Sequence, residues 1–177
     1  MRTKCRFLVI IVACLLAACG TMQSIVRSTI PYTTSLTVRA SAQTGQNLTA
    51  LGTATSFDNV IFKNGENTNR INAVKVISAE LRSTLPADFD LGQIKTLKIF
   101  MMKADESNAV LVASKENIPA DVGSLITLDA NTSGFLDPFI RDADIRIKMI
   151  YTLRNQVKAD ANLMLVMNLS AMPVNNR

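Results

Sequence analysis

The side chains of this chain that could do chemistry are carboxylates, because histidine is absent from all 177 residues. The cysteines, Cys5, Cys14 and Cys19, all lie near the N-terminus. Without histidine, serine or cysteine hydrolases of the triad type and histidine-ligated zinc sites are excluded. Glycoside hydrolysis by paired carboxylates stays open, and its candidates are Asp88, Asp90, Asp105, Glu106, Asp137 and Asp142. Their spacing singles out no pair, so we expect a protein that is not an enzyme and has no cofactor.

Two of these carboxylates, Asp88 and Asp90, alternate in the segment PADFDLG as the ligands of some calcium loops do. The other ligands of an EF-hand and its terminal glutamate are missing. The segment therefore favours a turn in which Phe89 is buried and the carboxylates face water. We expect no metal site.

The N-terminal segment has the layout of an export signal. Residues 1–6 carry three positive charges and no negative one, and residues 7–18 are uncharged and apolar. A permanent transmembrane helix needs about 20 apolar residues, so this run is too short to be one. We expect residues 1–18 to direct export and to be removed afterwards.

The end of that run, Leu16-Ala17-Ala18-Cys19, resembles the lipobox of bacterial lipoproteins at all four positions. The resemblance implies that Cys19 carries a diacylglycerol and becomes the mature N-terminus. We interpret residues 19–31 as a lipidated tether between the lipid and the domain. Two or more acyl chains, at about 0.8 kcal/mol for each buried methylene, make such an attachment nearly permanent. The thiol of Cys19 is then consumed, so the mature chain has no free cysteine for catalysis or metal binding.

The resemblance also bears on location. Many lipoproteins of the inner membrane have an aspartate directly after the cysteine, and this chain has Gly20 there. The resemblance therefore implies the outer membrane. No acidic run of the kind that some lineages use for surface export follows Cys19, which favours the periplasmic face over the cell surface.

The charge of the mature chain is nearly balanced. The full chain has 19 basic and 14 acidic residues, and three of the basic ones leave with the signal, so 16 against 14 leaves a net charge of +2. Basic and acidic residues are interspersed along the sequence. We therefore expect no nucleic-acid partner.

Residues 32–177 are predicted to form one all-β domain, because short runs of Val, Ile, Leu and Thr alternate with turn-forming clusters. We expect strands over 32–40, 48–55, 71–81, 94–102, 109–114, 125–128, 144–154 and 163–169. The last two alternate most clearly, which predicts a hairpin whose odd-numbered residues face the core. Eight strands favour an antiparallel sandwich, immunoglobulin-like or transthyretin-like, and a small closed barrel is the alternative.

Two apolar groups are candidates for a partner surface. The connection GFLDPFIRD contains Phe135, Leu136 and Phe139, which either insert into a partner or close one end of the sandwich. Its Asp-Pro pair is typical of the start of a single helical turn. The outward face of the last strand contains Met164 and Val166, which the tether or another protein is expected to cover.

These features together favour a membrane-anchored envelope lipoprotein that acts as a structural or protein-interaction module in an outer-membrane or periplasmic assembly. A lipoprotein that binds a small ligand or a glycan is the alternative. Sugar sites rely on exposed Trp and Tyr, whereas this chain has no Trp and two Tyr, of which Tyr151 is expected to face the core. A protein partner in the envelope is therefore the first expectation.

Overall fold

The computed structural model describes residues 28–54, 71–103, 105–140 and 145–173. These form the strands β1 (Ser28–Val38), β2 (Leu48–Ala54), β3 (Ile71–Leu85), β4 (Ile94–Met102), β5 (Val110–Lys115), β6 (Leu125–Ala130), β7 (Ile145–Leu153) and β8 (Ala161–Pro173). Two short helical segments, η2 (Leu91–Gln93) and α2 (Asp137–Ile140), lie between strands. All eight strands lie where the sequence predicts them, and β1 begins four residues before the expected domain boundary. The signal, Cys19 and the tether up to residue 27 lie outside the described residues.

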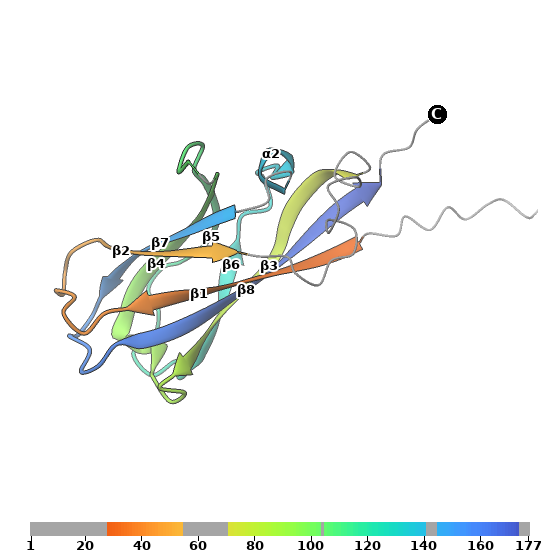
Figure 1. The fold of residues 1–177 in the computed structure, drawn as a ribbon. Coiled ribbons are helices and arrows are strands. Elements are labelled where there is room, and N and C mark those ends of the chain that lie inside the picture. Colours follow the sequence, from red (N-terminus) through yellow and green to blue (C-terminus); the bar gives the residue numbers. More distant parts are fainter. Residues whose placement is uncertain (1–27, 55–70, 104, 141–144, 174–177) are drawn as a thin grey trace, which may run out of the picture.

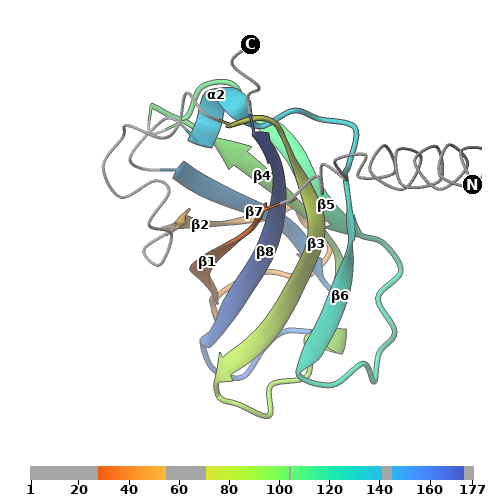
Figure 2. The same cartoon turned by 90° about the vertical axis from the view of Figure 1, so that its right-hand side faces the viewer.

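The strands form one sheet in the order β1-β8-β3-β6-β5-β4-β7-β2, and all the pairs are antiparallel. Four of the pairs are nested along the chain, from the outermost strands to the innermost: β1 with β8, β2 with β7, β3 with β6 and β4 with β5. These are the pairs of one long hairpin wound around a core, which is the jelly-roll arrangement. In Figures 1 and 2 the half β1-β8-β3-β6 lies across the core from the half β2-β7-β4-β5.

The all-β prediction with eight antiparallel strands is confirmed, and the curled sheet fits the small barrel that the sequence left as an alternative. Its two edge strands approach each other at a seam between β1 and β2. There the hydroxyl of Thr34 donates to the carbonyl oxygen of Thr53 at 3.0 Å. Gly52 permits this approach, because a Cβ at this position would lie 2.5 Å from the carbonyl oxygen of Ser35. The sheet is therefore nearly closed.

The predicted hairpin between the last two strands is wrong, although both strands exist. β7 pairs with β4 and β2, whereas β8 pairs with β1 and β3. Residues 154–160 therefore cross from one half of the barrel to the other instead of turning back within it. The predicted faces are right, since the odd-numbered residues of both strands are buried over 145–153 and 163–169.

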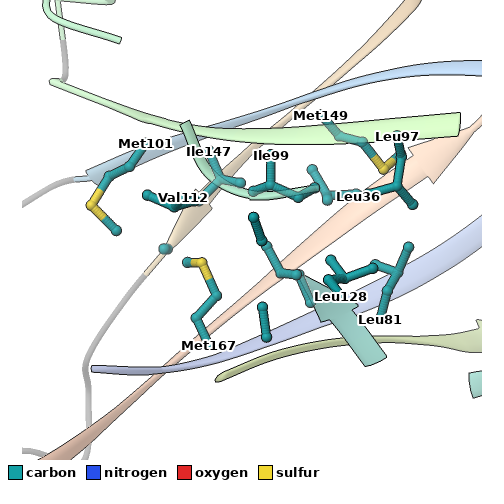
Figure 3. Close-up of a cluster of buried hydrophobic side chains, with 14 of the residues drawn as sticks. Leu36, Leu81, Leu97, Ile99, Met101, Val112, Leu128, Ile147, Met149 and Met167 are labelled. Atoms are coloured by element: carbon teal, nitrogen blue, oxygen red, sulfur yellow. The ribbon is translucent and has the colours of Figure 1, made fainter. Parts of the chain in front are cut away.

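The core fills the space between the two halves. Figure 3 shows Ile99 and Ile147 from one half pointing toward Leu81 and Met167 from the other. These side chains are fully buried, and burial of each aliphatic side chain stabilises the fold by about 1.5–3 kcal/mol. Thr34 is the one buried polar side chain among the described residues, and its hydroxyl is satisfied at the seam.

Candidate protein-docking groove

A groove of about 340 Å³ lies over the outer side of β3 and β8, where β3 begins and β8 ends. Figure 2 shows α2 at this end of the barrel. We call this end, where β1 and β3 begin and β8 ends, the α2 end. Three segments line the groove, namely the first half of β3, residues 132–135 and the last residues of β8. Their contributing side chains include Lys75, Ile77, Thr132, Phe135, Ser170 and Met172.

The groove exists because β3 is irregular where it passes β8. The register of the two strands shifts between Asn72 and Lys75 and again between Val76 and Ser78. Ala73 has a φ of 53°, a left-handed conformation that residues other than glycine rarely adopt. Bulges of this kind bend a strand and redirect its side chains. The outer surface is therefore hollowed at this point.

Phe135 is held beside β3 by backbone hydrogen bonds of its neighbours. β6 pairs with β3 only along Ala79–Arg82, so the first half of β3 needs other partners. The amide of Leu136 donates to the carbonyl oxygen of Val74 at 2.8 Å, and the amide of Val74 donates to a carboxylate oxygen of Asp137 at 3.3 Å. The segment before α2 thus fixes the rim of the groove.

Three large apolar side chains around the groove are exposed. The exposed fractions are 57% for Phe135, 48% for Ile77 and 40% for Met172. The ammonium group of Lys75 lies 4.4 Å from the ring centroid of Phe135, which is a cation–π contact worth about 0.5–1 kcal/mol at an exposed site. The groove thus combines an aromatic ring, aliphatic side chains and one positive charge.

The structure separates the three apolar residues that the sequence grouped in the GFLDPFIRD connection. Leu136 and Phe139 are 1% and 3% exposed and belong to the core, as does Ile140 of α2. They close the α2 end of the barrel, which is the second of the two roles expected for this segment from the sequence. Phe135 alone points outward and is available to a partner. The predicted helical turn is present as α2.

Met164 and Val166 lie on the outer face of β8 and are half-buried. Met164 has Ser35 and Arg82 as its register partners, and a guanidinium nitrogen of Arg82 donates to its sulfur at 3.2 Å. Val166 lies between Thr33 and Glu80. Long polar neighbours in the same sheet therefore shield part of both side chains. They share with the groove the outer face of β1-β8-β3-β6.

The candidate carboxylates are dispersed, and four of them have structural partners: Asp90 accepts from the amides of Gly92 and Gly123, Asp105 from Ser107, Glu106 from Arg146 and Asp137 from the amide of Val74. The hydrogen bonds from the side chain and backbone of Ser107 lower the pKa of Asp105. Asp88 is exposed, Phe89 is half-buried, and Asp142 lies outside the described residues. Within the described ranges, no three acidic, cysteine or histidine side chains gather as a metal site.

Sequence reasoning missed Lys75 and Ile77. A signal for Ile77 was present, because Val76 and Ile77 are adjacent apolar residues in a predicted strand whose alternation they interrupt. Such an interruption is typical of a bulge. The signal for Met172 was its position on the outward face of the last strand, where the sequence already indicated excess apolar surface.

The part of the chain that the structure describes contains no helix with the length and apolar character needed to cross a bilayer. Comparison with known protein families finds no family that matches the chain. A search of curated proteins likewise finds no match.

Proposed function

We propose that the protein is a lipid-anchored envelope lipoprotein whose barrel docks another protein through the outer face of β1-β8-β3-β6. The lipid attaches at Cys19, which ends the lipobox-like stretch Leu16-Ala17-Ala18-Cys19. Gly20 after that cysteine favours the outer membrane, with the domain in the periplasm. The protein acts there as an interaction module within an envelope assembly and needs no cofactor.

The observation that carries the proposal is the cluster of exposed apolar side chains at the groove. Phe135, Ile77 and Met172 are 40–57% exposed around one hollow. Single exposed apolar residues are common on protein surfaces, whereas a group of them marks an interaction site. Binding energy at protein interfaces concentrates in a few well-packed anchors, often aromatic, that fill a pocket. Phe135 supplies an aromatic ring at the groove, in contact with Lys75.

A sugar platform is less well supported. Such sites stack sugar rings on exposed aromatic residues, and both tyrosines, Tyr32 and Tyr151, are only 2% exposed. The groove volume of about 340 Å³ lies at the lower end of the range for small-ligand pockets. A small apolar ligand is therefore an outcome to be distinguished in the test.

Two full-length variants with matched exposure provide the test, Phe135→Asp in the groove and Leu125→Asp on β6, since the two wild-type side chains are 57% and 54% exposed. Each is captured from detergent-solubilised envelopes together with whatever protein co-purifies. We expect Phe135→Asp to lose a stoichiometric partner, Leu125→Asp to keep it, and both to melt at the wild-type temperature. Retention of every partner by folded Phe135→Asp contradicts the docking site, and a partner-free wild type with a bound small molecule favours the ligand-binding alternative.

The anchor is tested separately with Cys19→Ala. We expect this change to abolish incorporation of an alkyne-labelled fatty acid, because the acylated thiol is gone. Undiminished labelling of Cys19→Ala would remove the lipoprotein part of the proposal and leave the groove untouched.

A further inference from the structure

The outer face of the other half of the barrel, β2-β7-β4-β5, concentrates positive charge. These four strands contain no acidic residue, and their basic residues are Lys95, Lys98, Lys115, Arg146 and Lys148. The strands of the half that carries the groove are balanced, with Lys75 and Arg82 against Glu80 and Asp129. By register, Lys98, Arg146 and Lys148 lie on the outer face, and Lys95 is exposed where the register of β4 and β7 shifts. Lys115 is instead the register partner of the buried Leu97, at the end of β5. The fold thus gathers on one face basic residues that are separated along the sequence. We call this surface the basic face.

Apolar side chains lie between the charges of the basic face. Register partners in an antiparallel sheet share a face, so one row across the four strands contains Leu51, Lys148, Phe100 and Leu111. The next row contains Thr49, Ile150, Lys98 and Ser114. Leu51 is 50% exposed, and Phe100, Leu111 and Ile150 are half-buried. Each of the two lysines therefore has an apolar neighbour on the adjacent strand.

The two central lysines keep their charge uncompensated among the described residues. Arg146 lies 3.3 Å from Glu106, and Lys115 lies 3.0 Å from Asp129, so both are ion-paired. Within the described ranges, no such pair forms at Lys98 or Lys148. Among the described residues, the centre of the basic face therefore presents two ammonium groups without an ion pair, each next to an apolar side chain on an adjacent strand.

We infer that the basic face rests on anionic phospholipid headgroups of the membrane that holds the lipid anchor. The inference rests on the proposed anchor at Cys19 and extends it to the orientation of the domain. Lysines attract anionic lipids over a Debye length, and apolar side chains next to them add contact with the acyl boundary. Charge complementarity thus favours a bilayer of anionic lipid as the occupant of this face.

The length of the chain before β1 makes this contact possible. The nine peptide units from Cys19 to Ser28 span at most about 30 Å when fully extended. β8, with 13 residues, is about 40 Å long, so the tether is shorter than the barrel. The anchored domain stays close to the lipid, where even weak contacts form at high effective concentration. The groove, on the opposite side of the barrel, then faces away from the membrane.

Because the chain has no tryptophan, a single introduced tryptophan reports only on its own surroundings. Leu51→Trp on the basic face and Leu125→Trp on the opposite half each place a single tryptophan at a site of matched exposure, 50% and 54%. The full-length lipidated proteins are reconstituted in vesicles of phosphatidylcholine with or without phosphatidylglycerol. In the anionic vesicles we expect the emission of the Leu51→Trp protein to shift to shorter wavelength and to be quenched several-fold by brominated lipid. The emission of the Leu125→Trp protein should be unaffected.

A charge-reversal pair tests whether the lysines cause this contact. Lys98→Glu with Lys148→Glu on the basic face is compared with Lys75→Glu and Arg82→Glu on the opposite half, which changes the net charge equally. Both pairs are introduced into the Leu51→Trp protein. We expect the first pair to abolish the quenching of its tryptophan and the second pair to preserve it.

The vesicle experiments test the lipid anchor and the contact of the basic face with lipid separately. Flotation of the protein with vesicles reports the anchor alone, and failure to float overturns both the anchor and the lipid contact. If the Leu51→Trp protein floats but is not quenched, or if the Leu125→Trp protein is quenched equally, the orientation is overturned and the anchor stays intact. Quenching that is the same in neutral vesicles and after charge reversal contradicts recognition of anionic lipid and assigns the contact to apolar burial alone.

Discussion

The seam between β1 and β2 can be tested by adding one methyl group at Gly52. A Cβ at this position would lie 2.5 Å from both the carbonyl oxygen of Ser35 and the hydroxyl of Thr34. Real Cβ atoms keep more than 3.0 Å from such atoms, so Gly52→Ala must push the edge strands apart by several tenths of an ångström. That movement also stretches the 3.0 Å hydrogen bond from Thr34 to the carbonyl oxygen of Thr53.

The expected cost follows from these contacts. Overpacking a tight site costs about 1–3 kcal/mol, and a weakened hydrogen bond adds about 0.5–1.5 kcal/mol. Replacement of glycine by alanine also stabilises the fold by about 0.4–1 kcal/mol, because it restricts the unfolded chain. The net expectation is a loss of about 1–3 kcal/mol, read from urea midpoints of the purified protein with an unchanged m-value.

Gly134→Ala is the matched control. Its added Cβ would meet only a methyl carbon of Val110, at 3.4 Å, which is an ordinary contact. We therefore expect Gly134→Ala to be as stable as the wild type or slightly more stable. If Gly52→Ala were no less stable than Gly134→Ala, the edge strands would not meet at the seam, and the sheet would be an open one.

Three further predictions concern the core, one tyrosine and one acidic pair. Ile147→Ala should cost about 2–5 kcal/mol because Ile147 is fully buried, and Lys148→Ala less than about 0.5 kcal/mol; equal denaturant midpoints would show that the strand faces are wrong. Burial raises the pKa of Tyr151, so its phenol is protonated more tightly in the folded chain than in the unfolded one. The folded protein should therefore lose stability above about pH 10, where the unfolded phenol ionises, and Tyr151→Phe should lessen that loss in urea titrations at alkaline pH; parallel curves for the two proteins would contradict this reading. Asp90→Ala should cost about 1–2 kcal/mol, because Asp90 accepts hydrogen bonds from two backbone amides, whereas Asp88→Ala should be neutral because Asp88 is exposed. Urea midpoints of the two variants check this, and a larger loss for Asp88→Ala would contradict the structural role of Asp90.

Local alternation in the sequence predicted the strands well. The expected bounds of β4 are those of the structure, and the buried faces of β7 and β8 are the predicted ones. Alternation reports which face of a strand is buried, and it says nothing about the neighbouring strand. The pairing of β7 with β8 was therefore inferred from their adjacency in the sequence, and in the structure long-range packing gives each of them other partners.

The surfaces were harder to predict because they depend on the pairing. The sequence marked the apolar residues before and within α2, but only the fold separates exposed Phe135 from buried Leu136 and Phe139. The groove itself depends on bulges in β3, which the sequence indicated only through the adjacent Val76 and Ile77. The basic face likewise arises because four strands without acidic residues lie side by side while most carboxylates lie in loops.

Docking through the groove is tested most directly by photocrosslinking in intact cells. A benzophenone amino acid replaces Phe135 in one full-length variant and Leu125 in another, since these side chains are 57% and 54% exposed on the same half of the barrel. We expect one discrete crosslinked protein from position 135 that is absent from position 125. No adduct from position 135, or the same adducts from both positions, would contradict docking through the groove.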